Sequence, residues 1–192
     1  MNKNRLEAFT DGVIAIIITI MVIEMRIPHG QRMLALVPIL PVFLSYILSF
    51  IYVGIYWNNH HNMLHASGNI NGAVLWANLH LLFWLSLFPF VTGWMGENRL
   101  AQSPTELYGA VLLMASVAYL ILQHTIIAAG APVLQRALGK DWKGKASPLL
   151  YIFGILGTQR SPAFAKAVYA AVALLWLVPD RRIEKTLIKG KD

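Results

Sequence analysis

Charged residues are absent from one long stretch of this chain. Residues 33–96 contain no Asp, Glu, Lys or Arg. A helix that crosses a lipid bilayer needs roughly 20 predominantly apolar residues, so this stretch has room for two such helices and the turn between them. A soluble domain with this pattern would expose far too much apolar surface to water. The stretch therefore predicts an integral membrane protein.

Polar residues divide the charge-free stretch into two helices. Asn and His cluster at positions 58–62, and Gly and Asn follow at 68–72, which is typical of a hairpin turn. We therefore expect helices over residues 36–65 and 70–94. Two prolines fall near the start of the first helix, where they disturb it least. A second uncharged stretch, residues 107–135, predicts the next spanning helix.

The two ends of the chain predict the remaining helices. Near the N-terminus only residues 12–23 are free of charge; at 1.5 Å per residue they extend roughly 18 Å, less than the ~30 Å hydrocarbon core. The first helix must therefore begin near Asn4 and hold Asp11 at membrane depth. Residues 146–159 and 167–179 predict two shorter tilted helices, with a single broken hairpin as the alternative. We expect an all-α integral membrane protein with six transmembrane helices in one domain, residues 1–192.

Basic residues predict the orientation of the chain. The sequence holds 16 Lys+Arg against 9 Asp+Glu, a formal net charge of +7. With six helices both termini share one side, which then carries eleven of these basic residues against five on the other. The positive-inside rule places both termini in the cytoplasm, and we expect the cell membrane as the location. We expect no nucleic-acid partner, because the basic residues lie in short loops. The chain has no cysteine, which excludes disulfides and thiolate sites.

An intramembrane carboxylate is costly and requires a partner, so Asp11 is a candidate functional residue. The candidate partners are His60 and His61 at the end of the second helix, and Asn78 and His80 in the third. Such a polar cluster either holds the helices together or takes part in proton transfer or gating.

An apolar stripe continues beyond Asp11 along the first helix. Its members recur at helical spacing: Ile16, Thr19, Ile20, Ile23 and Ile27. The ordinary interpretation of such a stripe is packing or lipid contact. Spacing alone does not assign it a further role.

The start of the first helix resembles a known family. Residues 5–16, RLEAFTDGVIAI, are similar to the R-x-x-x-F-S-D signature of the transmembrane protein 175 family of potassium channels, found in lysosomes and in prokaryotes. Thr10 stands where the family has Ser and keeps the hydroxyl. The resemblance continues in order through YWNNHH at 56–61, LWANL at 75–79, FPF at 88–90 and LWLVPDRR at 175–182. It therefore covers most of the chain.

This resemblance implies a homotetramer in a lipid bilayer, with the first helix of each six-helix subunit lining a central pore for monovalent cations. It implies K⁺ as the permeating ion, no cofactor, no metal and no enzymatic activity. Carried over by position, Ile16 is the hydrophobic constriction, Thr19 contributes to potassium preference, and Ile20 and Ile23 continue the pore wall. A threonine ring in place of a TVGYG filter predicts a leak-like channel with modest preference for K⁺ over Na⁺.

The resemblance also implies a network that ties the pore helix to the second and third helices. The residues on the pore helix are Arg5, Phe9, Thr10 and Asp11. Their expected partners are His60, His61, Trp76 and Asn78.

Other functions remain open on the sequence. Asp11 and the His pair are compatible with a proton-coupled transporter of small cations, although no inverted repeat is visible. His61 and His65, four residues apart on one helix, are compatible with a metal or haem site in a membrane protein. A membrane protein with a purely structural role is the third alternative.

Overall fold

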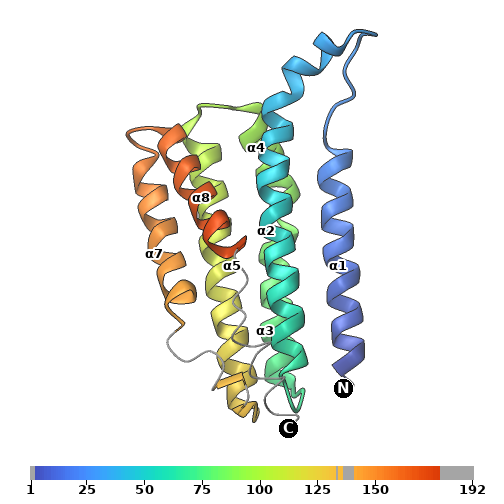
Figure 1. The fold of residues 1–192 in the computed structure, drawn as a ribbon, viewed down its shortest axis with the longest axis vertical. Helices are drawn as coiled ribbons and strands as arrows, with labels where there is room; N and C mark the ends of the chain where they lie inside the picture. Colours follow the sequence, from blue (N-terminus) through green and yellow to red (C-terminus); the bar gives the residue numbers. More distant parts are fainter. Residues whose placement is uncertain (1–2, 133, 136–140, 178–192) are drawn as a thin grey trace.

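The computed structural model describes residues 3–132, 134–135 and 141–177. In this part of the chain the regular elements are helical, as the sequence predicts, and they form a bundle in which η1 continues into α2 and α3 into α4, while successive spans run in opposite directions (Figure 1). They are α1 (Lys3–Ile23), η1 (Met33–Ile39, a 3₁₀ helix), α2 (Leu40–His65), α3 (Gly72–Ser86), α4 (Phe88–Glu97), α5 (Gln102–Ala128), α7 (Trp142–Gly157) and α8 (Pro162–Leu177).

Four segments of the described chain are long and apolar enough to cross a membrane. These are Lys3–Ile23, Met33–His65, Gly72–Glu97 and Gln102–Ala128. The second begins as the 3₁₀ helix η1 and becomes α-helical at Leu40, with Pro41 in the first turn of α2, where a missing N–H costs least. The last two helices, α7 and α8, have 16 residues each.

The third predicted helix is interrupted. The sequence predicts one helix over residues 70–94, whereas α3 ends at Ser86 and α4 begins at Phe88. Pro89 has no N–H to donate to the preceding turn, so regular helical bonding cannot pass through this point. The correction is two helices that follow one another closely, in place of a single helix.

The C-terminal helices are two separate elements packed against each other. Both begin earlier in the chain than the predicted 146–159 and 167–179. Asp141 caps α7 by accepting from the Gly144 N–H at 3.0 Å, and Pro162 opens α8, where its fixed φ suits the first helical position. The predicted end of the last helix, residues 178–179, lies outside the described residues.

The bundle has a tyrosine-rich core, with α1 at one edge. Tyr52, Tyr108, Tyr151 and Tyr169 are fully buried where α2, α5, α7 and α8 meet. Helix α1 packs on α2, α3 and α4 instead, and Figure 1 shows it at the edge opposite α7. Among the described helices, α1 is therefore covered from one side alone.

Candidate functional site

Helix α1 has one buried face and one uncovered face. The buried face carries Leu6, Thr10, Ile14, Ile17 and Met21 at helical spacing. On the opposite face, Ile16 is 59% exposed, Ile20 41% and Ile23 74%. These are three of the four residues that the resemblance assigns to a pore. The structure thus places them together on the side of α1 that no other helix of the described chain covers.

Thr19 is the polar member of this stripe, and it is also exposed. Its hydroxyl donates to the Ala15 carbonyl one turn earlier, at 2.9 Å. That bond uses the hydroxyl hydrogen and leaves the oxygen lone pairs available as acceptors. Thr19 can therefore offer an oxygen to a cation without breaking its own hydrogen bond.

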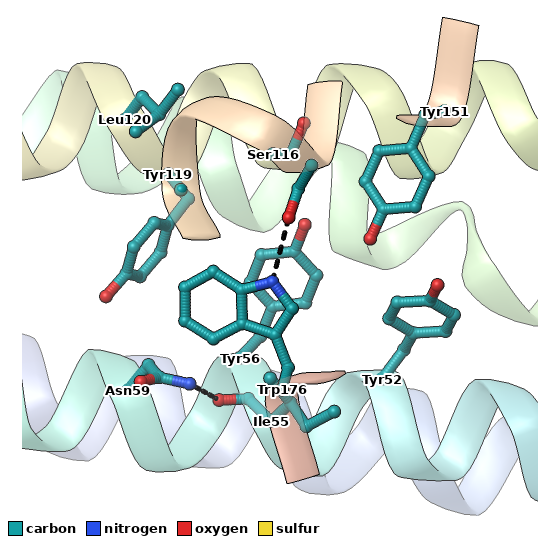
Figure 2. Close-up of a pocket in the computed structure, with 11 residues that line it drawn as sticks. Tyr52, Ile55, Tyr56, Asn59, Ser116, Tyr119, Leu120, Tyr151 and Trp176 are labelled. Carbon is teal, nitrogen blue, oxygen red and sulfur yellow. Dashed lines mark hydrogen bonds between the residues drawn. The ribbon is translucent and has the colours of Figure 1, made fainter. Parts of the chain in front are cut away.

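One pocket inside the described part of the bundle is too small to be a path for ions. Figure 2 shows a pocket enclosed by Tyr52 and Tyr56 from α2, Tyr119 from α5, Tyr151 from α7 and Trp176 from α8. Its volume is about 30 Å³, which is room for roughly one water molecule. Trp176 Nε1 closes one side by donating to Ser147 Oγ at 2.8 Å. A hydrated ion cannot pass through a space of this size.

A buried polar network fastens α1 to its neighbours. His60 Nε2 on α2 donates to Asn78 Oδ1 on α3 at 2.7 Å, and Asn78 Nδ2 donates to Thr10 Oγ1 on α1 at 3.0 Å. All three side chains are almost fully buried, at 2%, 0% and 0% exposure. The structure therefore brings together one expected residue from each of the first three spans.

Asp11 has a partner that the sequence analysis missed. Trp57 Nε1 on α2 donates to Asp11 Oδ1 at 2.9 Å. None of the four expected partners fills this role: His60 and Asn78 bond to each other, and His80 instead accepts from Trp84 on its own helix at 3.0 Å. The overlooked signal is the indole of Trp57, which is a donor in need of an acceptor inside a membrane span.

His61 also has a different partner from those considered. Its Nδ1 lies 2.7 Å from Glu7 Oε1, so an ion pair forms across α1 and α2 when the imidazole is protonated. Glu7 precedes Asp11 by about one turn of α1. Two acidic residues of the first helix thus contact the end of α2.

Three expected members stand apart from this network within one chain. Arg5 and Phe9 lie on the exposed side of α1, and Trp76 on α3 is 75% exposed. Within the described residues Arg5 makes no ion pair. Its position along α1 places it on the same helical face as Gly12, Ile16 and Ile23. The expected role of Arg5, Phe9 and Trp76 in tying the pore helix to α2 and α3 therefore stays a prediction.

Comparisons with known proteins agree on one family. Residues 5–89, which hold most of α1 and all of α2 and α3, match the model of the family described as endosomal/lysosomal potassium channel TMEM175. A protein from Chryseobacterium sp. (strain P1-3), named a potassium channel, is 51% identical over 189 residues, which cover 97% of this chain and 98% of that protein. Another potassium channel, from Streptomyces collinus (strain DSM 40733 / Tue 365), is 30% identical over 62% of each chain.

The fold has also been seen in a crystal structure. The structure of a protein described as a lysosomal potassium-selective channel TMEM175 homolog from Chamaesiphon minutus superimposes with a TM-score of 0.81. The match covers 93% of this chain and 97% of that one at 24% identity, so it shows a shared architecture. Together with the near full-length relative, these matches show that the chain belongs to the TMEM175 family of membrane potassium channels, which are not enzymes.

Proposed function

We propose that this protein is a potassium-permeable channel of the cell membrane, in which four copies surround a pore lined by α1. The observation that carries the proposal is the uncovered isoleucine face of α1, which lies opposite the face packed on α2, α3 and α4. The names of the relatives support potassium as the ion. Arg5 and Phe9, exposed on the same side of α1, are then available for contacts between subunits.

Ile16 supplies the constriction. Four isoleucine side chains around an axis form an apolar ring, and a narrow apolar ring resists the passage of ions because water withdraws from it. Ile20 and Ile23 extend the same wall toward the α1–η1 end. Gly12, whose absent side chain leaves open space, provides a wider section on the other side of Ile16.

Thr19 supplies the preference for potassium. Four hydroxyl oxygens replace part of the water shell of an ion, without the full carbonyl cage of a conventional filter. The expected discrimination between K⁺ and Na⁺ is therefore modest. The stripe carries no carboxylate, so we expect no preference for divalent cations.

The orientation follows from the basic residues. The start of α1 and the α2–α3 turn lie at one end of the bundle, and the α4–α5 connection lies at the other (Figure 1). The second end carries five basic residues: Arg26, Arg32, Arg99, Arg160 and Lys166. Many of the eleven that the sequence assigns to the other side belong to residues 136–140 and 178–192, outside the described part. The positive-inside rule then supports cytoplasmic termini.

Ion flux from proteoliposomes tests the proposal. Purified protein should pass K⁺ passively. Ile16→Asn should raise the flux severalfold because it wets the constriction, and Thr19→Ala should lower the ratio of K⁺ to Na⁺ permeability severalfold. Matched controls come from α5: Ile121 is exposed, and Thr125 donates to Ile121 O as Thr19 does to Ala15 O. Ile121→Asn and Thr125→Ala should leave permeation unchanged.

Two results would contradict this assignment. If the Ile16 and Thr19 variants permeate as the parent does while the complex stays intact, α1 does not line the path. If the flux saturates and requires a proton gradient, the protein is a proton-coupled transporter, and Asp11 and the His61–Glu7 pair become the proton-carrying candidates.

A further inference from the structure

An open apolar groove runs along the outside of the bundle between α2 and α8. Its volume is about 660 Å³. Leu40, Leu44 and Leu48 form one wall, spaced one helical turn apart on α2, and Ala167 and Ala170 of α8 form the other. The small alanine side chains keep the groove open. Such a surface is suited to a slender, flexible apolar ligand.

The groove has the length of an acyl chain segment. From Leu40 to Leu48, α2 rises about 12 Å, and half of the hydrocarbon core of a bilayer is about 15 Å thick. The groove starts near the α4–α5 connection, at one end of the bundle, and points toward its middle. Its position is therefore that of a lipid tail in one leaflet.

Two cationic side chains stand at the end of this groove. Arg99 lies in the α4–α5 connection, and Lys166 Nζ on α8 donates to the Arg99 carbonyl. Within the described residues neither cation has a carboxylate partner. Glu97 pairs with Arg26 at 3.2 Å, and Glu106 accepts from Gln102 and Thr158. The Arg99 guanidinium and two further donors of Lys166 remain available for an anion.

The groove faces away from the proposed pore. Helix α1 packs on α2, α3 and α4, whereas α8 packs on α2, α5 and α7, so the two lie on different sides of α2 (Figure 1). If α1 lies at the axis, as proposed above, the α2–α8 groove lies on the side of α2 away from that axis. Lipid, and not a second copy of the chain, is the expected neighbour there.

We propose that this groove binds one anionic glycerophospholipid per subunit. The phosphate lies between Arg99 and Lys166, and one acyl chain follows the leucine wall of α2. Charge-assisted hydrogen bonds to a phosphate are about twice as strong as neutral ones. A phospholipid with net negative charge offsets part of the charge of the two cations, whereas a zwitterionic headgroup has no net charge to offset it. The two cations at the end of the groove favour an anionic headgroup, and the apolar walls favour an acyl chain. An anionic phospholipid supplies both.

Lipid retention measured by native mass spectrometry tests the proposal. The full-length protein is reconstituted in equal amounts of phosphatidylglycerol and phosphatidylcholine and then extracted. We expect about one phosphatidylglycerol per subunit in the parent protein. Arg99→Gln with Lys166→Gln should lower that retention at least tenfold. The control is Arg32→Gln with Arg160→Gln, which removes the same charge from exposed positions at the same end of the bundle that do not line the groove.

A second pair of variants tests the groove without changing charge. Ala167 and Ala171 are both exposed on α8, but Ala167 lines the groove and Ala171 does not. Ala167→Phe should displace the bound phosphatidylglycerol, and Ala171→Phe should retain it. Melting temperature of each variant in detergent verifies that it is folded.

Several outcomes would overturn the proposal. If the parent protein retains phosphatidylglycerol and phosphatidylcholine equally, the proposal is wrong whatever the variants show. Equal loss in the Arg32/Arg160 control would show that surface charge alone attracts the lipid. If Ala167→Phe disrupts the assembly and leaves phosphatidylglycerol retention unchanged, the groove is a contact between copies.

Discussion

Asn78 joins three helices through one side chain. Its amide accepts from His60 on α2 and donates to Thr10 on α1, and no exposed surface remains on it. The sequence identifies each of these residues as polar inside a span, and it predicts that such groups need partners. It does not state which groups meet, because that depends on the rotation of each helix about its axis.

Replacing Asn78 with Ala should destabilise the protein. Two interhelical hydrogen bonds are lost, and each is worth about 0.6–1.7 kcal/mol in a membrane bundle, so a loss of about 1–3 kcal/mol is expected. Thermal unfolding in detergent measures it. Asn98→Ala is the control, because Asn98 is exposed and bonds to the Trp94 carbonyl of the preceding helix. If the two substitutions lower the melting temperature equally, the buried network does not stabilise the fold.

At the scale of helices, the sequence predicts the existence of the spans better than their details. The stretches without charged residues locate the spans, and the hairpin at residues 66–71 falls where the Asn- and Gly-rich segment predicts it. Hydropathy does not predict the interruption at Leu87, because Pro89 leaves the segment uncharged and predominantly apolar. Likewise the Trp57–Asp11 contact depends on how α1 and α2 face each other.

Close packing between α2 and α4 gives a prediction at this scale. A Cβ on Gly96 would lie 2.7 Å from the Cα of Val42, so Gly96→Ala forces the two helices apart. Overpacking of this kind costs about 1–3 kcal/mol. A Cβ on Gly54 meets nothing within 4 Å, so Gly54→Ala should be neutral or stabilising by up to about 1 kcal/mol. Gly96→Ala should therefore lower the melting temperature, and Gly54→Ala should leave it unchanged or raise it. A common fall would contradict the packing described here.

The orientation of the whole molecule is open to a direct measurement. Because the chain has no cysteine, a single introduced thiol is the sole target of a maleimide. Gln31→Cys lies between α1 and η1, and Asn69→Cys lies between α2 and α3, at opposite ends of the bundle. If the termini are cytoplasmic, a membrane-impermeant maleimide labels Cys at 31 in intact cells and Cys at 69 only after permeabilisation. The reverse pattern would place the termini outside.

The surfaces of one chain also predict how copies assemble. The α1 face at Ile16 and the outer surface of α7 at Leu149 are both apolar and exposed, at 59% and 68%. A lipid-facing helix and a pore-lining helix are both apolar and exposed in a single subunit, so the assignment of α1 to the pore combines its exposure with the match of its residues to the TMEM175 family. The proposed assembly around α1 would bring four copies of residue 16 together and hold the copies of residue 149 apart.

Cross-linking distinguishes these two surfaces. In membranes, Ile16→Cys treated with a short bis-maleimide should give a band of two linked chains, since one thiol per chain joins copies in pairs. Leu149→Cys, treated alike, should remain a single chain. Native mass spectrometry of the untreated Ile16→Cys protein should give the mass of four chains. Linked chains at position 149 and none at position 16 would instead place α7 at the centre of the assembly and α1 against the lipid.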